Sequence, residues 1–409
     1  MKKYLILFVP VILLVLSCKK NQEKENGYTG KSLVLTAKEQ QKADKDNEFT
    51  FKLLKEVAAD LPGSKNMMLS PLSVSMAVGM TSNGANGQTL EAIRNTMQFS
   101  DFTEAEVNAY YQKIITELPE LDPKAILNVA NSIWYRNGFE VLPAFLKTNS
   151  DHYKAEVQGL DFASPGAKDQ INNWVSTNTN GKIPTIIDQI RGDMVMFLIN
   201  AVYFKSNWSS KFDKNKTAKG DFHLTVQNKV QADFMTAMLK INSFINAEAS
   251  VIELPYGNKR YSMVIAMPTG ATTAGTLAET LTTQKWNQWM SGLREGQNDI
   301  RVPKFKFEYE IKLNDPLTAL GMGNAFSDMA DFTRLRSNGN LKIDEVKHKT
   351  FIEVNEEGTE AAAATSVGIV ETSAPAPIMI NRPFIFAIRE MKTGLILFTG
   401  IVNNPLLDK

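Results

Sequence analysis

Histidine and cysteine, which often perform catalysis or bind metals, are few in this chain, and their spacing gives them no shared site. Of 409 residues only three are histidines, His152, His223 and His348, and these form no metal-ligand pattern. No G-x-S-x-G, H-E-x-x-H or phosphate-binding glycine loop is present, and the only S-x-x-K sequence, from Ser17 to Lys20, crosses an expected processing site. The sequence therefore predicts a protein that is not an enzyme and that uses no metal or cofactor.

Composition and charge are those of an ordinary globular protein. Hydrophobic residues make up 43% of the chain, and 45 basic side chains accompany 44 acidic ones, for a formal net charge of +1. A charge this small gives no reason to expect nucleic acid as a partner. Because no internal repeat or further change of composition follows residue 47, we expect residues 47–409 to form one domain.

The N-terminus has the features of an export signal. Lys2 and Lys3 precede an apolar run at residues 4–16, which is too short to span a membrane. The run ends in Val-Leu-Ser-Cys at residues 15–18, which resembles a bacterial lipobox, where the cysteine is acylated, for example by palmitate. We expect a signal peptide at 1–17 and an exported bacterial lipoprotein held through Cys18 at the outer membrane or cell surface. A lone cysteine without a role is the alternative.

The segment after this cysteine resembles a linker. Residues 18–46 have few large apolar side chains apart from Leu33, Val34 and Leu35, so we expect a flexible tether between Cys18 and the domain. Because Cys18 is the only cysteine, its acylation would leave no thiol for a disulfide or for thiol catalysis.

Hydrophobic patterns in the remainder alternate between helical and strand periods. Ser70 followed by Pro71 predicts a capped helix start, and the apolar residues to Met80 predict that this helix is buried. Strands are expected at 194–204 and in two hairpins, at 253–267 and 384–402. The fold class is therefore α+β.

Residues 350–380 allow two interpretations. Four consecutive alanines at 361–364 favour a short surface helix. Gly358 before them and the β-branched residues after them argue against it. In the second interpretation the segment is a latent strand, whose alternate residues from Thr359 to Ile369 would face a core once it entered an existing sheet. Its leading half has small side chains, and Gly358 supplies the backbone freedom to fold over.

This segment closely resembles the hinge of inhibitory members of the serpin family. Other stretches are similar to motifs of the same family, in the family's order: 66–73, 172–175, 200–205 with Trp208, 253–256, 302–305, 325–327, 348–349 and 381–384. The resemblance runs from about Phe49 to the C-terminus. Each motif is short, but together they are highly specific.

The resemblance implies a fold and a function. The fold would have three β-sheets, eight to nine helices and an exposed reactive-centre loop at about 356–381. The function would be suicide inhibition of serine endopeptidases, with cysteine endopeptidases as a second target class, in which the cleaved loop inserts into the central sheet and traps the protease. The alternative is a non-inhibitory serpin that acts as a binding or chaperone-like surface protein. Target endopeptidases would be the partners, and a monomer is expected.

The resemblance also implies roles for individual residues. The hinge would comprise Glu356, Glu357, Gly358, Thr359, Glu360, Ala361, Ala362, Ala363, Ala364 and Thr365. Ser70, Ser73, Asn200 and His348 would form a polar cluster beneath the central strands, where the alternative is four separately satisfied core residues. Trp208 and an ion pair between Lys304 and Glu356 would mark the point where insertion begins, where the alternative for the pair is a solvated surface contact.

The bond attacked by the protease follows from the family's spacing, which places it between Thr372 and Ser373. Val370 and Glu371 offer neighbouring bonds for other proteases, and the β-branched candidates suggest an elastase-like preference. Heparin is not expected to bind where heparin-regulated relatives carry basic residues. The matching region here is acidic, with Asp101, Glu104, Glu106, Glu117, Glu120 and Asp122 against Lys113 alone.

The lipid anchor is directly testable. Replacing the cysteine, Cys18→Ala, is expected to release the protein from membranes without changing the activity of its domain, because the anchor acts only through the N-terminus. Metabolic labelling with a radioactive or clickable fatty acid checks this. Failure of the wild-type protein to take up label would end the lipoprotein hypothesis.

Overall fold

Helices gather around two packed sheets in the computed structural model, which describes residues 31–359 and 377–407. In these ranges the helices are α1 (Ala37–Ala59), α2 (Pro71–Ser82), α3 (Gly87–Thr96), α4 (Glu104–Glu117), α5 (Pro143–Tyr153), α6 (Ala167–Asn178), α7 (Ala274–Thr280), α8 (Thr283–Gly292) and α9 (Asn314–Leu317). This agrees with the expected α+β class. None of the helices in the described ranges has the length and apolar character needed to cross a membrane.

The central sheet positions the candidate site. Its strand order is β10 (Phe305–Lys312), β11 (Lys347–Asn355), β12 (Gly358–Thr359), β4 (Met196–Asn207), β2 (Ile126–Arg136) and β3 (Glu156–Leu160). β12 pairs antiparallel with both β11 and β4, so these two long strands run in the same direction on either side of it. The central strand expected at 194–204 is β4.

The other strands form one continuous sheet in place of the two that were expected. Its order is β1 (Met67–Leu69), β15 (Ile396–Val402), β14 (Phe384–Glu390), β8 (Tyr261–Pro268), β7 (Ala249–Pro255), β6 (Lys229–Ile245), β9 (Arg294–Pro303) and β13 (Ile378–Met379), with β5 (Ala218–His223) also on β6. The join is β6, whose 17 residues pair with β5 at one end and with β7 at the other. Both predicted hairpins are present, as β7–β8 and β14–β15.

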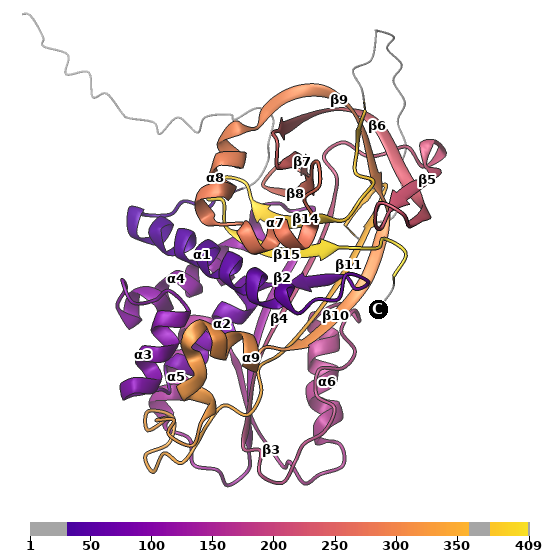
Figure 1. Cartoon of the computed structure of the whole chain (residues 1–409). Coiled ribbons are helices and arrows are strands. Elements are labelled where there is room, and N and C mark those ends of the chain that lie inside the picture. Colours follow the sequence, from indigo (N-terminus) through magenta and orange to yellow (C-terminus); the bar gives the residue numbers. More distant parts are fainter. Residues whose placement is uncertain (1–30, 360–376, 408–409) are drawn as a thin grey trace, which may run out of the picture.

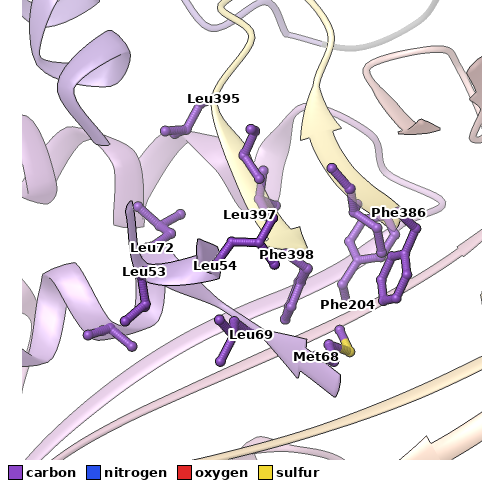
Figure 2. Close-up of a cluster of buried hydrophobic side chains, with 14 of the residues drawn as sticks. Leu53, Leu54, Met68, Leu69, Leu72, Phe204, Phe386, Leu395, Leu397 and Phe398 are labelled. Carbon is purple, nitrogen blue, oxygen red and sulfur yellow. The ribbon is translucent and has the colours of Figure 1, made fainter. Parts of the chain in front are cut away.

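The main core lies between α1, α2 and the continuous sheet. Leu53 and Leu54 of α1 meet Leu72 of α2 and the apolar side chains of β15 (Figure 2). α2 starts as predicted, because the Ser70 hydroxyl accepts a hydrogen bond from the Ser73 backbone N–H and Pro71 follows the cap. α6 lies apart from the other helices, beside the lower part of the central sheet (Figure 1), and covers a second, smaller core.

The predicted tether boundary at residue 46 is wrong for the part of this segment that the structure describes. α1 begins at Ala37 with a capping box between Thr36 and Glu39, and Leu33 is completely buried. The sequence pattern concealed this because α1 starts with polar residues. Cys18 and residues 19–30 lie outside the described residues.

A buried ion pair explains why polar residues occupy this first half of α1. The Lys42 ammonium lies 2.5 Å from the Asp46 carboxylate, and both side chains are almost fully buried. Lys42 also faces the rings of Phe99, Tyr110 and Tyr111 at 4.6 to 5.2 Å. Burial lowers the pKa of Lys42, against the opposing effect of Asp46.

Breaking this pair is expected to destabilise the fold. Lys42→Ala leaves Asp46 buried without its cation, which costs about 3–5 kcal/mol. Chemical denaturation monitored by circular dichroism measures the loss. The matched control is Lys38→Ala, because Lys38 is exposed on the same helix. Equal stability of the two variants would contradict a structural role for the pair and restore the tether interpretation.

Candidate functional site

The hinge predicted from the sequence begins as a strand of the central sheet. Gly358 pairs with Asn355 of β11 and Asn207 of β4, and Thr359 pairs with Val354 and Ser206. The hinge therefore already occupies the end of the slot between β4 and β11. Its remaining residues, Glu360, Ala361, Ala362, Ala363, Ala364 and Thr365, lie outside the described residues, as do Val370, Glu371, Thr372 and Ser373.

Gly358 occupies a position that no other residue fits. Its φ is +154°, and a Cβ atom there would lie 2.1 Å from the Ser206 carbonyl oxygen and 2.6 Å from the Asn207 Cα. Both contacts are with backbone atoms, which a side-chain rotation cannot relieve. Glycine is thus required for the chain to enter between the two strands.

The first inward side chain of the hinge is Thr359. It is buried, and its hydroxyl lies 2.6 Å from the hydroxyl of Tyr256, which is also buried. The Tyr256 ring stacks on Trp208 with centroids 4.5 Å apart, and the Trp208 indole N–H donates to the Asn355 carbonyl oxygen at 2.9 Å. Trp208 therefore lies at the predicted entry point, in contact with the strand that the hinge follows.

Two lysines hold the carboxylates that precede Gly358. Lys304 Nζ lies 3.1 Å from Glu356 Oε1, as expected, and Lys214 Nζ lies 2.6 Å from Glu357 Oε1. Both glutamates are about 95% buried, whereas the side chains of Lys304 and Lys214 are 39% and 58% exposed, so each pair is buried at its carboxylate and reaches solvent at its ammonium. Burial opposes ionisation of Glu356, but its backbone N–H, the Thr217 hydroxyl and Lys304 outweigh burial and lower the pKa of Glu356.

The predicted polar cluster lies further down the slot and is only partly connected. The Ser70 backbone N–H donates to His348 Nε2 at 2.9 Å, and the Ser70 hydroxyl donates to the Leu397 carbonyl oxygen. Burial lowers the pKa of His348 to about 4, so the ring is neutral near pH 7. Asn200 instead donates to Asn131, and its Oδ1 has no hydrogen-bond partner among the described residues. Ser73 enters the cluster through its backbone N–H, 3.4 Å from Ser70 Oγ.

A cavity of about 450 Å³ opens beside Asn200 and His348. β4 forms one wall, residues 341–348 form the other, and α2 forms the floor. Leu198, Val346 and Val74 are among the apolar side chains that line it. The slot is thus occupied by β12 at one end and hollow at the other. In the described ranges, no group of histidine and acidic side chains is arranged to hold a metal ion.

The sequence did not reveal two of these contacts. Tyr256 was noticed only as part of the 253–256 motif, and Lys214 carried no signal because it lies in a polar stretch with several lysines. Their partners, Thr359 and Glu357, are more than 100 residues away along the chain. In the structure, Tyr256 lies at the end of the predicted hairpin and forms an isolated β-bridge with Trp208.

Comparisons with known proteins agree with this geometry. A family model described as Serpin (serine protease inhibitor) matches residues 44–405. Human Serpin B4 is 32% identical over 391 residues, which cover 89% of this chain and 99% of Serpin B4.

Two solved structures have the same fold. The thermophilic serpin tengpin in its native state is 34% identical, with a TM-score of 0.82 over 91% of this chain and 96% of tengpin. Human thyroxine-binding globulin, solved with its hormone, is 28% identical, with a TM-score of 0.83 over 90% of this chain and 100% of that protein. The family model and these relatives span nearly the whole folded chain, so this protein belongs to the serpin family.

Proposed function

We propose that this serpin is a suicide inhibitor of serine endopeptidases, with cysteine endopeptidases as a second target class. The observation that carries the proposal is the hinge strand β12, which occupies one end of a slot that is otherwise without a strand among the described residues. A segment seated in this way can extend into the slot as soon as its other end is freed. Cleavage of the reactive-centre loop by a protease would free that end.

The register of β12 defines where the rest of the loop would go. Thr359 lies opposite Ser206 and Val354, and six residues further along, Asn200 and His348 face the position that Thr365 would take. Val367 and Ile369 would then follow beside Leu198 and Val346, where the cavity lies. The apolar walls of the cavity thus lie where Val367 and Ile369 of the inserted loop would lie. The polar groups lie where Thr365 would lie.

The chemistry of trapping belongs to the target protease. Its nucleophile attacks the Thr372 carbonyl carbon and forms an acyl-enzyme, while the bond to Ser373 breaks and Ser373 gains a free amine. Insertion of about fifteen residues at roughly 3.3 Å each then carries the acylated protease about 50 Å. Inhibition results if insertion finishes before water hydrolyses the acyl-enzyme.

The non-inhibitory alternative remains the competing function, because thyroxine-binding globulin shares the fold. The hinge favours inhibition. Gly358 and Thr359 fit the slot, and the alanines after them have the small side chains that rapid insertion needs. From the β-branched residues near Thr372 we further propose an elastase-like target protease. We also propose that the protein is a monomer and that Cys18 attaches it to the outer membrane or cell surface.

The direct test is incubation with a panel of elastase-like, trypsin-like and cysteine proteases. A covalent complex that survives boiling in detergent is expected with at least one of them. Cleavage by every protease in the panel without any such complex would favour the non-inhibitory alternative.

A charge at the first inward position of the hinge is expected to abolish trapping. Thr359→Arg would place a guanidinium against buried Tyr256, at a cost of several kcal/mol. Insertion would slow while deacylation continued, so the variant should be cut near Thr372 and released as a substrate. The measurement is the stoichiometry of inhibition together with gel electrophoresis of the products.

The matched control is Thr372→Arg, which changes the attacked bond and leaves the hinge intact. This variant should redirect trapping toward trypsin-like proteases. If Thr359→Arg still formed the covalent complex at wild-type stoichiometry, insertion through this hinge would be the wrong mechanism.

A further inference from the structure

The hollow end of the slot has the size and lining of a small-molecule site. Its volume of about 450 Å³ lies within the roughly 300–1,000 Å³ typical of ligand pockets. Most of its wall is apolar, with Val74 and Val78 from α2 and Leu198 from β4. An extended apolar body fits such a wall, whereas a sugar or nucleotide would leave its hydroxyls unpaired there.

Charged side chains also line this cavity, and among the described residues all but one of its cations have carboxylate partners. Arg191 pairs with Asp193 and Asp344, Lys342 with Asp328, and Lys347 with Glu310. Glu345, the remaining lining carboxylate, is exposed to solvent.

Arg336 is the exception among these cations. Its guanidinium lies 4.8 Å from the centre of the Phe139 ring, and both residues line the cavity. The described residues supply no hydrogen bond or ion pair to this guanidinium, and its Nε is buried without a partner. A half-buried arginine beside an apolar wall is a strong site for a carboxylate, because its planar group can donate two parallel hydrogen bonds.

We propose that this cavity binds one amphiphile with a long apolar body and a single anionic head, of the fatty-acid class, with the head on Arg336. The body would extend between β4 and α2, against Val74, Val78 and Leu198. The ligand would thereby bury apolar surface that lines the cavity.

If the protein is an inhibitor as proposed, ligand binding has a further consequence. Only this consequence, and not the ligand site itself, rests on the proposed function. The amphiphile would occupy the place that Val367 and Ile369 take on insertion. A bound ligand would therefore compete with the last part of insertion and turn the inhibitor into a substrate at high ligand concentration, by selective binding to the uncleaved state.

Fluorescence titration of the uncleaved protein with cis-parinarate, a fluorescent fatty acid, tests the site. Saturable binding of one molecule per chain is expected, with displacement by dodecanoate and weaker displacement by 1-dodecanol, which lacks the anionic head. Arg336→Gln should weaken binding by about tenfold or more, and Arg336→Lys should restore only part of it, because an ammonium keeps the charge but cannot donate two parallel hydrogen bonds from one planar group. Arg294→Gln, an exposed arginine away from the cavity, is the matched control and should bind as wild type.

A second variant fills the cavity and leaves Arg336 unchanged. Ala77→Phe would fill part of the cavity from α2, and a circular dichroism spectrum like that of wild type would show that it folds. Its binding should be lost. Equal binding by wild type, Arg336→Gln and Ala77→Phe, or no saturable binding by wild type, would overturn the proposal.

The same titration after loop cleavage separates the two proposals. A cleaved protein that has gained thermal stability should no longer bind cis-parinarate, and continued binding would contradict the competition. A cleaved protein that gains no stability and still binds would contradict insertion, while the ligand site would stand.

Discussion

The structure depends on two long parallel strands whose facing edges are joined by only two residues. β4 and β11 both pair with β12, and beyond Thr359 no described strand lies between them. Unpaired strand edges readily accept another strand, because each backbone N–H and C=O gains a partner in the ladder. The fold therefore retains a favourable pairing, which the proposed insertion of the loop would complete.

Local contacts hold this arrangement at its two ends. At the entry, the ion pairs Lys304–Glu356 and Lys214–Glu357 and the Trp208–Tyr256 stack position the hinge. Further down, neutral His348 accepts a hydrogen bond from the Ser70 backbone N–H and lines the cavity, in which no strand of the described residues lies. Close contacts around β12 and a cavity further along the slot suit a loop whose hinge is already paired and whose remainder inserts after cleavage.

Local signals in the sequence predicted much of this, and contacts distant in sequence could not be predicted. Ser70 with Pro71 predicted the start of α2, and the turn residues predicted both hairpins. The start of α1 was missed because Lys42 and Asp46 look like solvated residues until Phe99 and Tyr110 surround them. Gly358 was singled out for flexibility, whereas the structure shows that the close Ser206 backbone excludes any larger residue. The cavity depends on the spacing of packed elements and leaves no trace in a residue pattern.

The central claim is that the loop completes the central sheet once it is cut. Differential scanning calorimetry before and after a single cut in the loop by a non-target protease tests it most directly, with the cut confirmed by mass spectrometry. Insertion would add a backbone ladder and bury Val367 and Ile369, so a clearly higher melting temperature is expected for the cleaved protein. An unchanged melting temperature in fully cleaved protein would mean that the loop does not insert and would contradict the account.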